Sequence, residues 1–200
     1  VMVLTVVISL VTGLAFRKKF FGSNLLFYTT VASLIVPSIL VSLGIGLSFN
    51  IMGWEVSWTT SGLGAHLTWT LPFGFLIMIA VFNRFDKSYE EAARDLGASN
   101  WQTIRHIVLP IIGPSLIGVA LFGFTLSYDE FARTLMTSGV KNTLPLEIFG
   151  MTTNVTTPTL YALGTLTTFF SLFMILTAMG VLFYLRRRQE SHGSDAGKGV

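Results

Sequence analysis

Side chains that can transfer protons gather in one polar stretch of this 200-residue chain, between Asn83 and Pro110. They are Asp86, Glu90, Glu91, Asp95 and His106. General acid–base catalysis needs such groups to converge on one reacting atom. The stretch has a helical pattern, and helical spacing sets these side chains on different faces. We therefore expect no catalytic residues here.

Motifs for nucleotide or metal binding are absent from the sequence. There is no G-x-x-x-x-G-K-[ST] loop to cradle phosphates and no H-E-x-x-H pair. The chain has no cysteine, and His66 lacks a second ligand at helical spacing. We expect no metal ion and no cofactor in this chain, so that any ATP hydrolysis would take place in a separate subunit.

A second group of polar residues, Tyr128, Asp129 and Glu130, follows a long apolar segment. Carboxylates beside a low-dielectric pore attract cations, which makes these residues candidates for the path of a positively charged substrate. The alternative is that they mark the boundary with water and pair with Arg133, because ionisable groups are common at the ends of membrane spans. The sequence leaves both interpretations open and slightly favours the second.

The local pattern predicts two short helices within the polar stretch. Ser88 and Glu91 have the spacing of a capping box, which begins a helix, and Gly97 stands where a left-handed residue would end it. Ser99 and Gln102 repeat the capping box for a second helix. Pro110 follows, and a kink is expected there. The stretch is therefore a helical hairpin, which either packs on its own bundle or docks a partner.

The rest of the chain has the composition of a membrane protein. Hydrophobic residues make up 52% and charged residues 12%, which excludes a soluble enzyme, a disordered chain and a nucleic-acid-binding module. Apolar runs of this length form helices in lipid, because a helix satisfies its own backbone groups. The predicted fold is an all-α polytopic membrane bundle with five spans. They are Val1–Phe16, Leu25–Phe49, Ser57–Phe82, Ile107–Ser127 and Pro158–Leu185.

Basic residues predict how these spans are oriented. All Lys and Arg residues except Arg133 and Lys141 fall in the loops of one side or after the last span. The positive-inside rule makes that side cytoplasmic and places the C-terminus there. The first span is short, which we interpret as the end of a span whose beginning, together with an earlier span, lies outside this sequence. Residues 189–200 are polar and are predicted to be a disordered cytoplasmic tail.

One part of the polar stretch resembles a known family. The residues concerned are Glu91, Ala92, Ala93, Gly97, Ile107, Leu109 and Pro110. They match the EAA loop of ATP-binding-cassette (ABC) importer permeases, whose pattern is E-A-A, three residues, G, nine residues, I, one residue, L-P. Every fixed position and both spacings are present. The segment from Phe124 to Leu146 also resembles permeases for spermidine and putrescine.

The resemblance implies a function for the chain. Residues 1–188 would be the transmembrane domain of a type I permease, and loop 84–110 would couple it to a cytoplasmic ATPase dimer. The seven residues of the pattern would be the coupling residues. The other implied partners are a second permease subunit, either different or identical, an extracytoplasmic substrate-binding protein and the lipid of the inner membrane. Nucleic acid is not an expected partner.

Several alternatives remain open at this level. The cargo of an ABC permease would be a polyamine-like cation by resemblance, but an amino acid, a metal complex or an anion is possible. An integral membrane enzyme would need converging acid, base or metal groups in loop 84–110. An ion-driven secondary transporter would usually carry ionisable residues in mid-span. The apolar spans carry none, which counts against this last alternative.

Overall fold

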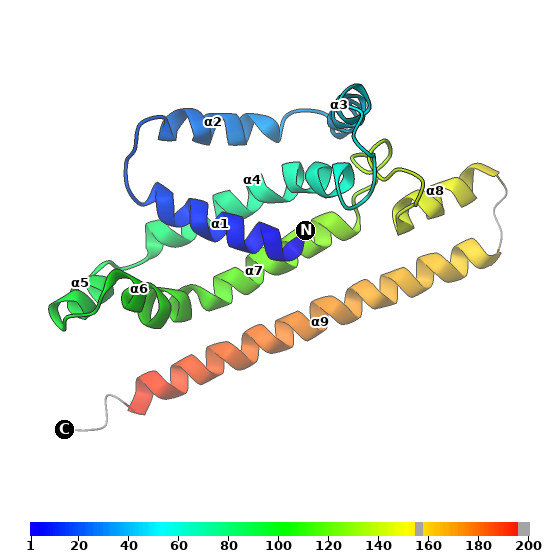
Figure 1. Cartoon of the computed structure of the whole chain (residues 1–200). Coiled ribbons are helices and arrows are strands. Elements are labelled where there is room, and N and C mark those ends of the chain that lie inside the picture. Colours follow the sequence, from blue (N-terminus) through cyan, green and yellow to red (C-terminus); the bar gives the residue numbers. More distant parts are fainter. Residues whose placement is uncertain (155–157, 196–200) are drawn as a thin grey trace.

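The computed structural model describes residues 1–154 and 158–195, and within them it is all-α, as predicted (Figure 1). The helices are α1 (Met2–Phe16), α2 (Ser23–Ser33), α3 (Ser38–Ile51), α4 (Ser61–Arg84), α5 (Ser88–Asp95), α6 (Asn100–Thr103), the π-helical turn η1 (Ile104–Val108), α7 (Leu109–Tyr128), α8 (Leu144–Asn154) and α9 (Pro158–Asp195).

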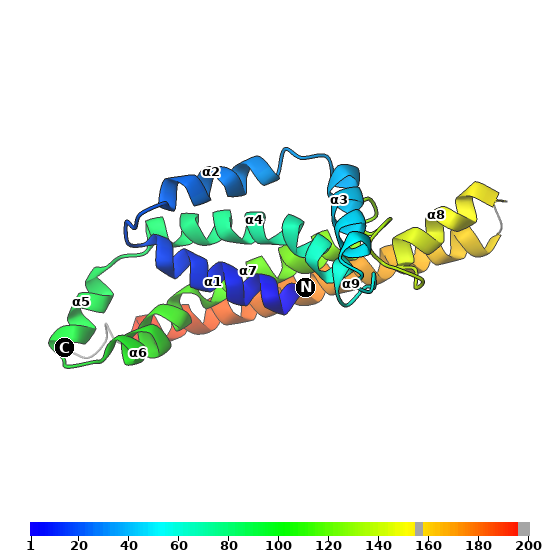
Figure 2. The same cartoon turned by 45° about the horizontal axis from the view of Figure 1, so that its top comes forward.

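Three helices, α1, α4 and α7, pack together and form the core. Its buried apolar residues are Met78, Phe82, Val108, Ile112 and Val119. Apolar side chains of α1 and α4 pack around this cluster. Helix α9 runs alongside α7 and contacts α7 and α8 (Figures 1 and 2). The most apolar stretch of α9, within Pro158–Tyr184, has no residue buried against the rest of the chain. Lipid or another protein must therefore cover it.

Small residues let α1 approach α4 closely. Thr5, Ser9 and Gly13 recur every four residues on one face of α1, and all three are buried. The hydroxyl groups of Thr5 and Thr70 share a hydrogen bond of 2.8 Å. A Cβ added to Gly74 of α4 would overlap Ser9. Such close contact between small residues is the usual basis of helix association in membranes.

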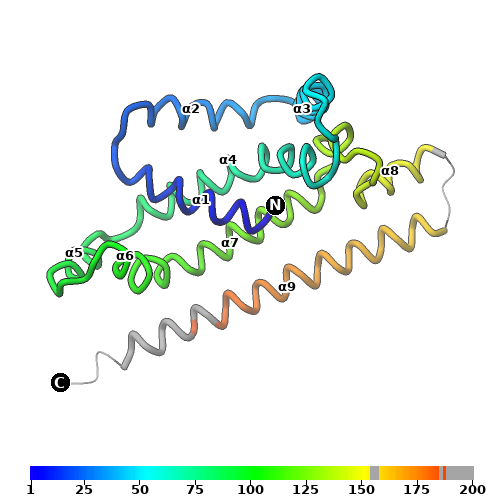
Figure 3. The backbone as a smooth tube through the Cα atoms, in the orientation of Figure 1, coloured from blue at the N-terminus to red at the C-terminus, as the bar shows by residue number. Residues whose placement is uncertain are grey.

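The second predicted span, Leu25–Phe49, is wrong as a single straight helix. It is divided into α2 and α3, which are bent by 106° (Figure 3). The break lies just before Pro37, which is the N-cap of α3. Proline has no backbone N–H and disfavours the helical conformation of the preceding residue, which explains the break.

The other predicted spans correspond to apolar helices. The structure has three that are long enough to cross a membrane, Ser61–Arg84, Asn100–Tyr128 and Pro158–Tyr184, and a fourth if α2 and α3 are counted together. Helix α1 is shorter than a span, as expected. Residues 189–195 continue α9 where the sequence predicts disorder, because extending a formed helix costs little. Residues 196–200 lie outside the described residues.

The connections gather at two opposite ends of the bundle. Helices α5 and α6 lie at one end, together with the C-terminal end of α9, and α3 and α8 lie at the other (Figures 1 and 2). Loop 84–110 therefore lies at the end where the sequence places its basic residues. Residues 129–143, which connect α7 to α8, lie at the opposite end, with α3.

Small residues of α3 form a packing face. Ser42 Oγ donates to the carbonyl of Arg133 and accepts from the N–H of Met136, both at 3.0 Å. A Cβ on Gly46 would meet the carbonyl oxygen of Met136 at 2.7 Å. This face therefore holds the 133–136 segment against α3.

We expect Gly139→Ala to destabilise the protein. Gly139 has φ +71°, and a Cβ there would overlap the carbonyl oxygen of Val56. An L-residue in this left-handed region costs about 1–2 kcal/mol before any overlap is counted. Thermal unfolding in detergent should therefore begin at a lower temperature. The control is Gly118→Ala, a helical position where a Cβ meets nothing within 4 Å. Equal stability of the two variants would contradict this account.

Candidate functional sites

Loop 84–110 is the first candidate site. Its helix α5 begins at Ser88. The side chain of Ser88 does not cap the helix. Instead, Asp86 Oδ1 accepts from the backbone N–H of Ser88 at 2.9 Å. Hydrogen bonds from the N–H and the hydroxyl of Ser88 hold the pKa of Asp86 below its usual value. The predicted capping box of Ser88 and Glu91 is therefore wrong, because Lys87 is the N-cap of α5 and its carbonyl accepts from the N–H of Glu91 at 3.1 Å.

The turn after α5 is as predicted. Gly97 has φ +82°, the left-handed conformation that glycine adopts without strain. Ser99 and Gln102 form the predicted capping box at the start of α6. The disturbance expected at Pro110 takes the form of the π turn η1, immediately before α7. A wider turn accommodates the missing N–H and the ring of a proline in the helix that follows.

A groove of about 590 Å³ opens on this loop. Its lining residues are Tyr89, Ala92, Ala93, Leu96, Gly97, Ala98, Gln102, His106 and Ile107. Most of this surface is apolar although it belongs to a polar loop, and Leu96 is 90% exposed. Exposed apolar surface of this kind marks sites of protein interaction. The groove is therefore a candidate docking surface.

The structure brings together only some of the predicted coupling residues. Ala92, Ala93, Gly97 and Ile107 line the groove. Glu91 is exposed on α5 but does not line it. Leu109 and Pro110 begin α7, and Leu109 packs against the core. The neighbouring Glu90 was missed. It is buried and forms an ion pair with Arg17, which no spacing in the sequence predicts.

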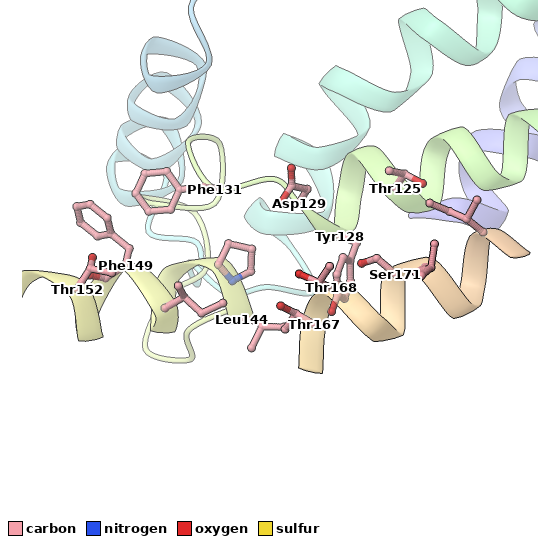
Figure 4. Close-up of a pocket in the computed structure, with 14 residues that line it drawn as sticks. Thr125, Tyr128, Asp129, Phe131, Leu144, Phe149, Thr152, Thr167, Thr168 and Ser171 are labelled. Atoms are coloured by element: carbon pink, nitrogen blue, oxygen red, sulfur yellow. The ribbon is translucent and has the colours of Figure 1, made fainter. Parts of the chain in front are cut away.

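The second candidate site is a cavity of about 740 Å³ between α7, α8 and α9 (Figure 4). Its lining residues are Thr125, Tyr128, Asp129, Phe131, Leu144, Pro145, Ile148, Phe149, Thr152, Thr167, Thr168, Ser171, Leu172 and Ile175. It thus combines one carboxylate with aromatic rings and hydroxyl groups. Sequence analysis predicted Tyr128 and Asp129 but not the hydroxyl groups, which come from helices far apart in the chain.

The four threonine hydroxyl groups of this cavity can act as acceptors. Thr125, Thr152, Thr167 and Thr168 each donate to a carbonyl oxygen of their own helix. A hydroxyl that has donated its hydrogen still accepts through its oxygen. With Asp129 as the only charged lining residue among those described, the cavity offers hydrogen-bond acceptors and negative charge. Aromatic faces such as those of Tyr128 and Phe131 also attract cations.

Glu130 does not line the cavity. Its carboxylate accepts from the backbone N–H of Arg133 at 2.9 Å and lies 3.5 Å from Arg133 Nη1. Arg133 is completely buried, donates to Ser38 Oγ at 2.7 Å and lies 4.3 Å from the ring centroid of Trp69. Burial lowers the pKa of Arg133, which Glu130 opposes. Glu130 is therefore a structural ion-pair partner, and its prediction as a path residue is not supported by this geometry.

A family model for the binding-protein-dependent transport system inner membrane component matches residues 5–191. The chain belongs to this family. It is 33% identical over 178 residues to the spermidine/putrescine transport system permease protein PotC of Haemophilus influenzae, with 88% of this chain and 65% of that protein covered. It is 31% identical over 182 residues to the putrescine transport system permease protein PotI of Escherichia coli K12, with 86% and 62% covered.

The chain is also similar to a sulfate permease protein and to one solved structure. The chain is 37% identical over 116 residues to a probable sulfate transport system permease protein of Chlorella vulgaris. The match covers 55% of this chain and 42% of that protein. This chain has the fold of a chain of the MetNI methionine ABC transporter in an inward-facing conformation. The TM-score is 0.62 at 17% identity, with 92% of this chain and 86% of that chain covered. The chain spans 60–66% of the length of the PotC proteins it matches.

Proposed function

We propose that this chain belongs to the permease subunit of an ATP-driven importer, which forms half of the translocation path for a small polyamine-like cation. The observation that carries the proposal is the apolar groove on loop 84–110, because four of the seven residues of the EAA pattern line it. Membership of the permease family and the similarity to proteins named for spermidine and putrescine support it.

The two ends of the bundle suggest where partners bind. An ATPase dimer would fill the groove on loop 84–110, at the cytoplasmic end, and the exposed Glu91 would meet its basic or backbone N–H groups. A substrate-binding protein would dock at the opposite end, near the cavity of Asp129. A second permease subunit, different or identical, would cover part of the unburied face of α9. The C-terminus would then be cytoplasmic, in a multi-pass protein of the inner membrane.

Transport would follow from differential binding of these partners. A bundle with two arrangements shifts toward the one that a partner binds better. Closure of an ATPase dimer on loop 84–110 would favour one arrangement, and nucleotide release the other. The chain itself would perform no chemical step, and its contribution would be the path and the coupling surface.

The nature of the cargo is suggested by the cavity. A polyammonium ion donates hydrogen bonds through every nitrogen, and the hydroxyl oxygens and Asp129 accept them. An anion such as sulfate would need donors, but all four threonine hydroxyls of the lining donate to carbonyl oxygens of their own helices. The geometry therefore favours a cation over the anionic cargo named for the Chlorella vulgaris relative.

Reconstitution tests this function. The full protein that contains this chain would be co-purified with its ATPase, partner permease and binding protein, and placed in proteoliposomes. We expect ATP-dependent, saturable uptake of radiolabelled spermidine or putrescine. Labelled sulfate and methionine are the controls and should not accumulate. Uptake of sulfate without uptake of either polyamine would refute the proposed cargo, and uptake that did not require ATP would refute the proposed class of transporter.

A further inference from the structure

An ion pair joins loop 84–110 to the first helix of the bundle. Arg17, the C-cap of α1, donates from Nη1 to Glu90 Oε1 of α5 at 2.6 Å. The two side chains are only 16% and 10% exposed. The residues are far apart in the chain, so this contact exists only in the folded molecule.

The surroundings of the pair make it a strong contact. The Arg17 guanidinium lies 5.2 Å from the ring centroid of Phe82 and 5.3 Å from that of Phe85, at the end of α4. Aromatic rings attract the cation and keep water away, so salt screens the pair less than an exposed one. Arg94 lies 3.9 Å from the other oxygen of Glu90, but it is 55% exposed and contributes little.

The rest of α5 has weak ties to the bundle. It packs mainly against α6 and η1, which belong to the same loop. A helix of eight residues has little stability of its own. The contact between Arg17 and Glu90 therefore supplies a connection from α5 to α1 that the backbone of the loop does not provide.

This connection lies outside the docking groove. Ala92 and Ala93 line the groove, but Glu90 does not. Helix α1 in turn packs on α4 and α7 through the buried stripe of Thr5, Ser9 and Gly13. A displacement of α5 by a partner in the groove is thus passed through the ion pair to α1 and from there to the core.

We propose that Arg17 and Glu90 are positioning residues that transmit the movement of loop 84–110 to α1. This inference rests on the proposed function, because it needs a partner in the groove. The pair touches neither nucleotide nor substrate. Its loss leaves the docking surface in place but allows α5 to move without α1, so that ATP is hydrolysed without transport.

The test uses the reconstituted complex with two single variants, Glu90→Gln and Arg17→Gln. We expect both to hydrolyse ATP while the amount of polyamine taken up per ATP falls about fivefold or more, within the range of allosteric couplings. The matched controls are Asp95→Asn on α5 and Lys18→Gln beside Arg17, both exposed, which should keep the wild-type ratio. Unchanged ratios in both single variants would overturn the proposal.

The charge swap, Arg17→Glu with Glu90→Arg, separates transmission from a structural defect. It should recover at least half of the wild-type ratio, because the pair is restored with reversed polarity. If the single variants do not fold, the charge-swap variant alone tests the proposal. A wild-type ratio of polyamine taken up per ATP supports the proposal, and a ratio of one-fifth of the wild-type value or less overturns it.

A distance measurement keeps this test independent of the proposed function. Spin labels at Lys19 and Asp95 would report the separation of α1 and α5 in the purified protein. We expect a narrow distribution in the wild type, unchanged by ATP in the complex, and a broader one with Glu90→Gln. An equally narrow distribution in the variant would overturn the inferred link. If no complex transports polyamine but the distributions differ as expected, the proposed function fails and the link stands.

Discussion

Replacement of Ala92 by Trp should abolish ATP-driven uptake by the reconstituted complex. Ala92 lines the groove of about 590 Å³ on loop 84–110, and its small side chain leaves the groove open. An indole ring would occupy the space that a partner needs. Because Ala92 is exposed, the ring extends into solvent and the bundle still folds. Loss of a central interface contact lowers the binding free energy by about 2 kcal/mol or more. A groove filled by an indole ring should lower it further.

Co-purification of the ATPase with the tagged permease measures this effect, with uptake measured in parallel. We expect both to fall by at least about 30-fold, which corresponds to 2 kcal/mol of binding free energy. Asp95→Trp is the control, since Asp95 is exposed on the same helix but does not line the groove. If the ATPase still bound the Ala92 variant normally, the groove would not be its docking site.

Asp129→Lys should prevent uptake of spermidine while leaving the complex assembled. Asp129 is the only charged residue described in the lining of the cavity between α7, α8 and α9. A lysine there places a positive charge beside a polycation, and like-charge juxtaposition costs several kcal/mol. Uptake should fall by about 100-fold or more. Asp129→Asn removes the charge without reversing it, and we expect an intermediate loss.

The control for this variant is Glu55→Lys. Glu55 is also an exposed carboxylate between two helices, but it does not line the cavity. The same change of net charge there should leave uptake close to that of the wild type. Equal losses at the two positions would show that overall charge matters and that Asp129 has no special place in the path. Normal uptake by the Asp129 variant would remove the cavity from the proposed path.

The two acidic residues at the end of α7 illustrate why sequence left the site open. Asp129 and Glu130 are adjacent and chemically alike, yet one lines a cavity and the other is bound to a buried arginine. Both residues follow Tyr128, the last residue of α7, so no helical register fixes the direction of either side chain. Which direction leads to Arg133 depends on the packing of the 129–138 segment against α3. Glu90 and Glu91 are likewise adjacent and chemically alike, and only the first meets Arg17.

Local physics explains the features that were predicted correctly. The second capping box, the left-handed Gly97 and the apolar helices each depend on residues within one or two turns of each other. The break between α2 and α3 is also local, and Pro37 was a signal for it that the length of the apolar run concealed. Ser88 failed as a cap because α5 begins one residue earlier than that cap requires, with Lys87 as the N-cap, and the N–H of Glu91 donates to the Lys87 carbonyl.

The sequence by itself determined that the chain is an all-α membrane bundle, that loop 84–110 is helical and that the chain carries the residue pattern that resembles its family, because each of these follows from short-range spacing or from hydropathy. Only the tertiary structure decided which carboxylate is buried, which one faces a cavity, and which hydroxyl groups join it. Those choices depend on residues far apart in the chain, such as Arg17 and Glu90, which form an ion pair, and Thr125 and Thr168, which line one cavity. Such contacts are set by the packing of whole helices, which no local spacing encodes.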